Sequence, residues 1–485
     1  MSAAIIFIIV VAVITLLGLI LAEMPIWVAL AGSGTLGLLL LSGSNVAWST
    51  LAQVPYGSTA NYALVVIPMF VLMGVFAHRA GLAKDLFAVA QRLTYRLPGG
   101  LGVATILACG GFSAVTGSSV ATVATIGRIS VDQMVSRGYR ANAAAALVAL
   151  GATLGVLIPP SILMVVFGIL TGESIGRLLM AGIIPGLVTM FFYMASVVVL
   201  YKRGYFAPKT EKELAVQRMY EAELSNRLDV MEGKEVAAGS TAVRTQVKTG
   251  RVTDKLADLP KVTRKNIAGG LYTALLFTVV IGGMYSGLFT STEAGAVAAV
   301  ASLIILLLRT FREGVKGVFN SVKESLIESA SVSTMIFALL FGGAIFAFFL
   351  LKSGVPNAIA KSVIAANLPP LVVIVISLVM LIILGAFLDE LSILLIVIPL
   401  LWPVIDQMGV DGIWYGILVM KATSIGMIAP PVGLNVFVAS GTSKHASADG
   451  IYKAILPFFI VEILVIATLI IFPDLSTFLP NLMFG

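Results

Sequence analysis

The residues with the clearest chemical potential lie in Lys421–Ser440, KATSIGMIAPPVGLNVFVAS, an apolar stretch that a helix cannot cross unbroken. Pro430 and Pro431 each remove a backbone donor and bias the preceding residue away from helical angles. Inside a membrane, unwound backbone is tolerated only where it is buried in protein or lines a polar cavity, and there its free carbonyls can bind ions. Gly151–Ser161, GATLGVLIPPS, repeats the arrangement. A simple proline kink is the alternative for either segment, but the duplication favours a transport site.

Free carbonyls beside hydroxyl and carboxylate groups suit a desolvated Na⁺, a hard cation that takes about five or six oxygen ligands. We expect two such sites, each joining a double-proline break to the polar interruption of another apolar stretch. The residues predicted to bind Na⁺ are Ser113, Ser118, Gly151, Thr153, Gly155 and Ser161 in the first site, and Asp389, Thr423, Ser424, Gly426, Gly433 and Asn435 in the second. For any single hydroxyl, a hydrogen bond back to its own helix is the alternative.

Charged residues within the apolar stretches are few, and each calls for an explanation. A carboxylate deep in a membrane costs at least about 2.5–3.5 kcal/mol on insertion scales, so we expect Asp389 to face a cavity or a partner. We expect Glu390 to point to the membrane interface, and Glu23 and Glu293 to cap helix ends, where a carboxylate is favoured. Lys421 either snorkels outward or supplies positive charge for an anionic substrate.

The composition indicates an all-α polytopic membrane protein. Of the 485 residues 59% are hydrophobic and 11% are charged, whereas soluble chains carry about 25% charged residues. The net charge of +7 is assigned to basic cytoplasmic loops and not to a nucleic-acid partner. One cysteine and two distant histidines give no disulfide and no Cys/His metal cluster. No Ser/His/Asp triad, acid–base carboxylate pair or phosphate loop is apparent, so we do not expect an enzyme.

The elements that must position these residues fall into three parts. The first repeat, 1–201, holds spans near 3–21, 25–41, 60–78 and 178–201, a re-entrant hairpin near 101–134 and a broken helix near 140–168. A polar cytoplasmic loop, 202–265, follows; within it a surface helix is expected over 211–231 and a mobile segment over 232–253. The second repeat, 266–485, holds spans near 267–286, 293–308, 331–350 and 453–472, a hairpin near 370–404 and a broken helix near 413–440.

The two repeats align at a nearly constant offset. Ser118 and Asp389 lie 271 residues apart, as do the two double prolines, and Glu23 lies 270 residues before Glu293. With five crossings in each repeat, the second copy is inverted relative to the first. The distribution of basic residues then places the polar loop in the cytoplasm and both termini outside.

At these residues the chain resembles the large, DctM-type membrane subunit of tripartite ATP-independent periplasmic (TRAP) transporters. The likeness lies in SAVTGSSVATVATIG (Ser113–Gly127), GATLGVLIPPSI (Gly151–Ile162), FLD (Phe387–Asp389) and IAPPVGLNVFVAS (Ile428–Ser440). The family often has an acidic residue two before the glycine of the second break, where this chain has Ser424, and Lys421 stands close by. Both departures bear on the second sodium site or on the substrate.

The resemblance implies an elevator mechanism driven by Na⁺ in a bacterial inner membrane. It implies two partners, a small four-helix membrane subunit and a periplasmic binding protein that delivers an organic acid such as a C4-dicarboxylate, sialic acid or another carboxylate or sulfonate. It places the substrate between the two hairpin tips. The residues implied for substrate binding are Thr116, Ser118, Ser119, Pro159, Asp389 and Pro430.

Two other functions stay open. A stand-alone Na⁺- or H⁺-coupled anion permease of related architecture would need no binding protein. A membrane enzyme would turn over a lipid or a nucleotide.

Overall fold

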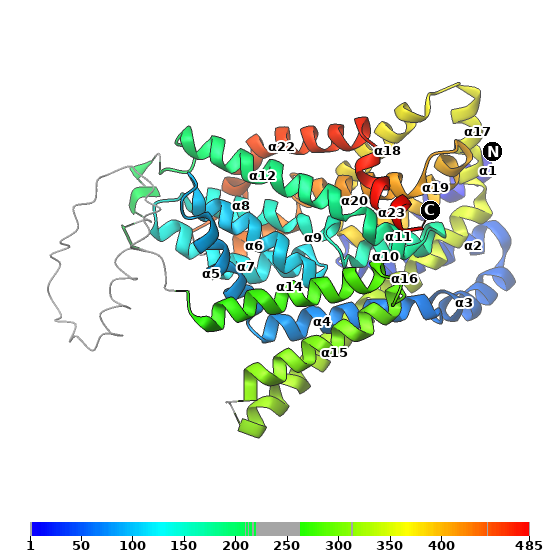
Figure 1. The fold of residues 1–485 in the computed structure, drawn as a ribbon. Coiled ribbons are helices and arrows are strands. Elements are labelled where there is room, and N and C mark those ends of the chain that lie inside the picture. Colours follow the sequence, from blue (N-terminus) through cyan, green and yellow to red (C-terminus); the bar gives the residue numbers. More distant parts are fainter. Residues whose placement is uncertain are drawn as a thin grey trace.

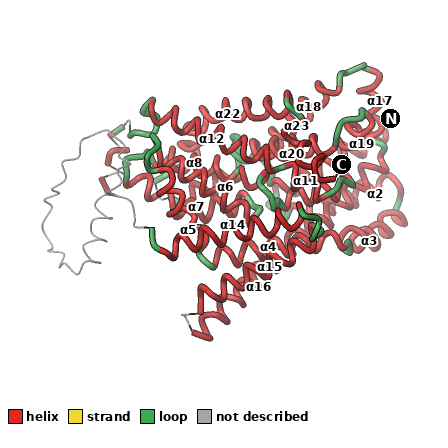
Figure 2. Tube along the Cα trace, viewed as in Figure 1, coloured by secondary structure: helices red, strands yellow, loops and turns green. Residues whose placement is uncertain are grey.

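The computed structural model describes residues 2–208, parts of 210–219, and residues 262–311, 314–443 and 445–484. Within these ranges every regular element is a helix (Figure 2). Eight of the described helices are long and apolar enough to cross a membrane, or nine when one bent pair is counted as a span. The expected all-α membrane protein is confirmed. The expected surface helix over 211–231 and the segment 232–253 lie almost wholly outside the described residues.

Helices before the polar loop follow the apolar pattern closely. Between the expected second and third spans, residues 44–59 are also helical. The helices are α1 (Ala3–Leu21), α2 (Ile26–Ser42), α3 (Ser44–Thr59), η1 (Tyr62–Val65), α4 (Val66–Arg79), α5 (Leu82–Thr94), α6 (Gly100–Thr116), α7 (Ser119–Ser136), α8 (Ala141–Ala152), α9 (Leu154–Leu157), α10 (Ile162–Thr171), α11 (Ile175–Ala181) and α12 (Ile183–Lys202).

Helices after the polar loop differ from expectation in more than one element, because the structure adds two short helices over 355–365 and 474–484. The span expected at 331–350 is part of one 40-residue helix, whose first half projects from the bundle (Figure 1). The helices are α14 (Arg264–Tyr285), α15 (Ser291–Thr310), α16 (Gly314–Ser353), α17 (Val355–Ala365), α18 (Pro370–Gly385), α19 (Glu390–Gln407), α20 (Gly412–Gly426), α21 (Leu434–Gly441), α22 (Ala448–Ile471) and α23 (Asp474–Phe484).

Two groups of helices divide the bundle. In the first group, α16 packs along α2, α3 and α4, while α15 packs along α4 and α14, and α1 along α2. The second group holds the hairpin helices α6, α7, α18 and α19 together with the interrupted helices α8–α10 and α20–α21. Both termini lie at one end of the bundle (Figure 1).

Within the second group, the two interrupted helices exchange partners. The segment α10 packs against α19 and α20, and α21 packs against α7 and α8. The helix α8, ANAAAALVALGA, is buried along its whole length, because small side chains let neighbouring backbones approach closely. Each short helix that follows a double proline therefore rests on the other half of the chain.

The capping expectation is confirmed for Glu293 and is wrong for Glu23. Glu293 completes a capping box with Thr290, whose backbone N–H donates to Glu293 Oε2 at 2.8 Å. Glu23 instead lies in the turn between α1 and α2 with a φ of +60°, and Pro25 occupies the position before α2, which has no side-chain cap.

Candidate ion- and substrate-binding site

Both double prolines interrupt their helices. The first break lies between Leu157, the last residue of α9, and Ile162, the first of α10, and the helix axis bends by 43° across it. The second lies between α20 and α21. The Pro159–Pro160 and Pro430–Pro431 peptide bonds are both cis. Pro159 is buried, whereas Pro430 is exposed.

The tip of the first hairpin lies directly on the first break. Gly117 ends α6 with a φ of +60°, and a Cβ at this position would lie 2.3 Å from the carbonyl oxygen of Pro160. A Cβ on Gly155 would lie 3.1 Å from Ser113 Oγ and 3.2 Å from the carbonyl carbon of Ser118. Only glycine fits at position 117, whereas a Cβ at position 155 would require its neighbours to shift by a few tenths of an ångström. The structure thus brings Ser113, Ser118 and Gly155 together.

The tip of the second hairpin lies on the second break in the same way. Gly385 and Gly426 pack back to back, so that a Cβ on Gly426 would lie 2.5 Å from Gly385 Cα. The carbonyl oxygen of Ala386 accepts hydrogen bonds from the backbone N–H groups of Val432 at 3.0 Å and Gly433 at 3.1 Å. These bonds fix the unwound segment against the hairpin tip.

The two tips also contact each other. Ser119 Oγ donates a hydrogen bond to Glu390 Oε1 at 2.7 Å, and both side chains are buried. The expectation that Glu390 points to the membrane interface is wrong, because the start of α19 meets the start of α7 and Glu390 is buried at this contact. The repeat offset was the signal that could have found the pair, since Ser119 and Glu390 lie 271 residues apart.

Asp389 caps the helix that follows it. Its carboxylate accepts hydrogen bonds from the backbone N–H groups of Leu391 and Ser392, both at 3.1 Å, and from Ser392 Oγ. Ser118, its counterpart in the first tip, accepts from the backbone N–H of Ala121 at 3.3 Å. Both residues are partly exposed at their tips.

Two predicted sodium ligands have buried polar atoms with no partner among the described residues. Ser161 Oγ lies at the N-terminus of α10, and the side-chain oxygen and nitrogen of Asn435 lie in the first turn of α21. Both residues are fully buried. A buried polar atom without a partner costs about 1–3 kcal/mol. An ion or ordered water at each break would remove that cost, so the donor set fits a hard cation.

Other predicted ligands already have hydrogen-bond partners. Thr423 Oγ1 donates to the carbonyls of Val419 and Met420, and Ser424 Oγ donates to the carbonyl of Lys421 at 2.8 Å. For these two residues the structure therefore shows the alternative stated above, a hydrogen bond back to the residue's own helix. Thr116 Oγ1 donates to the Phe112 carbonyl at 3.3 Å, and Ser113 Oγ lies 3.1 Å from Thr122 Oγ1. Their oxygen lone pairs remain available to a cation.

Gly151 and Thr153 face away from the hairpin tip. A Cβ on Gly151 would lie 3.0 Å from Cys109 Cβ, in the middle of α6. Thr153 Oγ1 contacts Leu150 O at 2.6 Å and Tyr193 OH at 2.8 Å, on the side of α12. The Thr153 hydroxyl is therefore not brought to the site that contains Ser113 and Gly155.

Lys421 neither snorkels nor stands free for an anion. It is fully buried, and its ammonium group forms an ion pair with Glu462 on α22. Apolar sequence around both residues gave no sign of this pairing.

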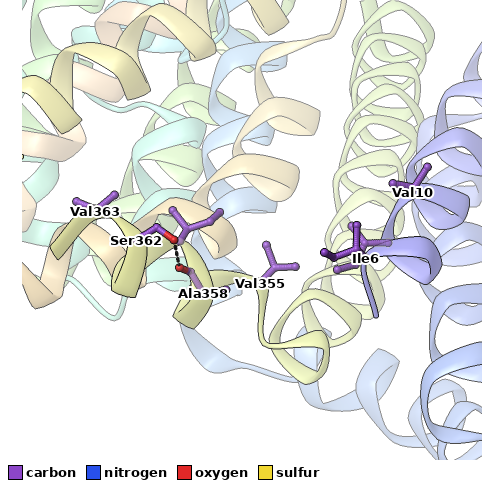
Figure 3. A pocket seen from close by; sticks show the side chains of 8 residues that line it. Ile6, Val10, Val355, Ala358, Ser362 and Val363 are labelled. Carbon is purple, nitrogen blue, oxygen red and sulfur yellow. Dashed lines mark hydrogen bonds between the residues drawn. The ribbon is translucent and has the colours of Figure 1, made fainter. Parts of the chain in front are cut away.

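A separate pocket of about 360 Å³ lies between α1 and α17. Figure 3 shows Ile6 and Val10 on one side and Val355 and Val363 on the other. The Ser362 hydroxyl beside it donates to the Ala358 carbonyl at 2.9 Å. The lining is almost wholly apolar and includes none of the predicted site residues, so this pocket does not suit an organic anion.

The fold is similar to that of the YdaH transporter of Alcanivorax borkumensis, with a TM-score of 0.57 and 14% identity over 92% of this chain and 89% of that one. This likeness places the chain among all-helical membrane transport folds. The chain belongs to the DctM family, because the family model "Tripartite ATP-independent periplasmic transporter, DctM component" matches residues 13–475.

Two relatives illustrate the range of this family. The chain is 32% identical to the C4-dicarboxylate TRAP transporter large permease protein DctM of Pseudomonas aeruginosa, over 93% of both chains. It is 28% identical to the sialic acid TRAP transporter large permease protein SiaM of Vibrio cholerae, over 97% of both chains. The resemblance in the sequence motifs is thereby confirmed.

Proposed function

We propose that this chain is the transport subunit of a Na⁺-coupled importer of an organic acid. The observation that carries the sodium proposal is the pair of buried groups that have no hydrogen-bond partner in the described part of the chain, Ser161 Oγ and the Asn435 amide. One lies after each double proline, where unwound backbone adds free carbonyl oxygens. Repeated polar sites with unsatisfied oxygens favour a cation that binds in each cycle.

An anionic substrate is supported by the helix ends at the tips. The helices α7, α10, α19 and α21 all begin at a tip or a break. The N-terminus of a helix carries a partial positive charge and free N–H groups, which favour a carboxylate. The two relatives named above transport carboxylates by their names. The substrate lies, in this proposal, between the tips near Thr116, Ser118, Ser119 and Asp389.

An elevator movement is supported by the division of the bundle into two groups. The tips and breaks hold one another through glycine contacts and hydrogen bonds, whereas α2, α4 and α15 pack mainly with one another and with α1, α14 and α16. The helix α16 also packs along α19. A group that is internally fastened can slide as one body against the other. The substrate and Na⁺ travel with the tips in this proposal.

We propose as partners a small four-helix membrane subunit and a periplasmic binding protein, in a bacterial inner membrane with both termini in the periplasm. A cysteine introduced at the exposed Ser2, in a chain whose Cys109 is replaced, tests the orientation. We expect an impermeant thiol reagent to label it in intact spheroplasts. Labelling only after the membrane is opened would contradict this orientation.

The central experiment is uptake of a labelled C4-dicarboxylate or sialic acid into proteoliposomes that contain the chain with its two partners. We expect uptake to require an inward Na⁺ gradient. Equal uptake when choline replaces Na⁺ would reject the coupling. Full transport by this chain alone would instead favour the stand-alone permease.

A further inference from the structure

Four buried side chains from separate parts of the fold form one polar cluster behind the breaks. We call Thr153, Tyr193, Lys421 and Glu462 the Lys421 cluster. Lys421 Nζ forms an ion pair with Glu462 Oε2 and donates a hydrogen bond to Tyr193 OH at 3.0 Å. Tyr193 OH in turn donates to Glu462 Oε1, and it lies 2.8 Å from Thr153 Oγ1. All four side chains are at most 1% exposed.

The cluster connects both interrupted helices. Thr153 joins α8 to α9 before the first break, and Lys421 lies on α20 before the second. Tyr193 on α12 and Glu462 on α22 bridge them. The Lys421 cluster therefore ties α12 and α22 to the two interrupted helices that carry the proposed sodium sites, although it does not share their unwound carbonyls.

Stability alone is a weak explanation for such a pair. Taking two charges out of water costs several kcal/mol for each ion, and well-packed apolar residues often replace a buried pair at no loss. Removing only one partner is strongly destabilising, because the other charge is left uncompensated. The atoms that contact the ammonium group of Lys421 indicate a second reason for the two charges.

The ammonium group contacts two oxygen atoms, and a third lies one contact further away. Glu462 contributes a carboxylate, Tyr193 a phenol, and Thr153 a hydroxyl one contact further away. Carboxylate and neutral oxygens are the ligands that hard cations take from proteins. With the lysine side chain removed, the remaining pocket would carry one negative charge in a dry interior and would have to take up a cation or a proton.

We propose that Glu462, Tyr193 and Thr153 form a monovalent-cation site that this chain fills permanently with the ammonium group of Lys421. The site is distinct from the two sodium sites at the breaks. This consequence alone rests on the proposed Na⁺ coupling: the Lys421 ammonium group stays in its site through every cycle without being exchanged, and Glu462 balances its charge.

The test is the thermal unfolding of purified chain in detergent, measured at constant ionic strength while NaCl replaces choline chloride. In Lys421→Ala we expect a Na⁺-dependent rise in Tm of about 2–5 °C beyond any rise of the wild type, as for a ligand that reaches many times its Kd. Direct ²²Na⁺ binding should show one more site than in the wild type. An unchanged Na⁺ response and an unchanged number of sites would overturn the proposal.

The matched control is Lys421→Ala/Glu462→Gln, which removes both charges. We expect the additional Na⁺ response to vanish in this variant. If Lys421→Ala does not accumulate as folded protein, adding Glu462→Gln should restore its yield, because it removes the uncompensated charge. A double variant that folds no better than the single one, or that keeps the additional site, would contradict the assignment of Glu462 as the anionic ligand.

These outcomes separate the two proposals. If the Tm of the wild type does not respond to Na⁺, the proposed coupling is contradicted, but the comparison between Lys421→Ala and its control still tests the cation site. If the wild type responds to Na⁺ and Lys421→Ala responds to the same extent, only the proposed cation site of the Lys421 cluster is contradicted.

Discussion

Ser119 and Glu390 begin two helices that lie 271 residues apart in the chain, and the hydroxyl of one donates to the carboxylate of the other at 2.7 Å. The helices α7 and α19 have the same length of 18 residues. The contact therefore joins corresponding positions of the two halves, where the tips meet.

Loss of the Ser119 hydroxyl should destabilise the tips. In Ser119→Ala, Glu390 stays buried without its donor, and we expect a loss of about 1–3 kcal/mol in the free energy of unfolding. Adding Glu390→Gln should recover part of that loss, because a neutral amide is cheaper to bury. Thermal unfolding of the two single variants and the double variant measures the coupling. Independent effects that simply add would argue against the contact.

Gly426→Ala should prevent the second hairpin tip from packing against the break between α20 and α21. The added methyl group meets the Gly385 backbone at 2.5 Å, and backbone yields less readily than a side chain. We expect a loss of at least about 1–3 kcal/mol in stability, together with loss of uptake. Gly282→Ala in α14 is the control, since its nearest neighbour is the Thr278 methyl group at 3.7 Å. Wild-type uptake by Gly426→Ala would be inconsistent with this packing.

Ser161→Ala and Asn435→Ala should weaken Na⁺ activation with little loss of stability in Na⁺-free buffer. Their polar atoms have no partner among the described residues, so no protein hydrogen bond is lost. We expect the Na⁺ concentration for half-maximal uptake to rise about tenfold or more, equivalent to one lost ligand of about 1.4 kcal/mol. Ser130→Ala is the control, because Ser130 Oγ donates to the Ile126 carbonyl at 2.8 Å within α7. Unaltered Na⁺ activation in both variants would count against the sodium sites.

Glu173, in the loop between α10 and α11, should make stability depend on pH. Burial raises the pKa of Glu173, the Asp411 and Asp406 carboxylates add to the shift, and Arg177 opposes it. A raised pKa means that the folded state holds its proton more tightly than the unfolded state. The corresponding stability is present below the ordinary pKa of 4.5 and is lost as pH rises through the folded-state pKa.

Glu173→Gln should remove that component. We expect its stability above this pH range to exceed that of the wild type slightly, with a flatter dependence on pH through the same range. Thermal unfolding between pH 4 and pH 8 provides the measurement. A steeper pH dependence in Glu173→Gln would reverse the assigned sign.

The sequence predicted the breaks and tips because proline and glycine act locally. Pro159 and Pro430 cannot continue a helix, and Gly117 adopts a backbone angle that other residues avoid. These effects require no knowledge of distant packing. The inverted arrangement of the two halves and the Na⁺ sites remain predictions.

The expectations that proved wrong concern side chains whose direction is set by residues far away in the chain. The direction of Glu390 depends on its contact with Ser119, which begins α7 in the other half of the chain. The partners of Lys421 lie on α12 and α22, which carry Tyr193 and Glu462 within apolar stretches. Neither local propensity nor the hydrophobic pattern specifies such a contact.

The exchange of α10 and α21 has a consequence for biosynthesis. When the first half leaves the ribosome, α19 and α20 have not yet been made. The apolar face of α10 therefore stays in contact with lipid until the rest of the chain has been inserted. The break and tip of the first half therefore reach their final packing only after translation of the second half.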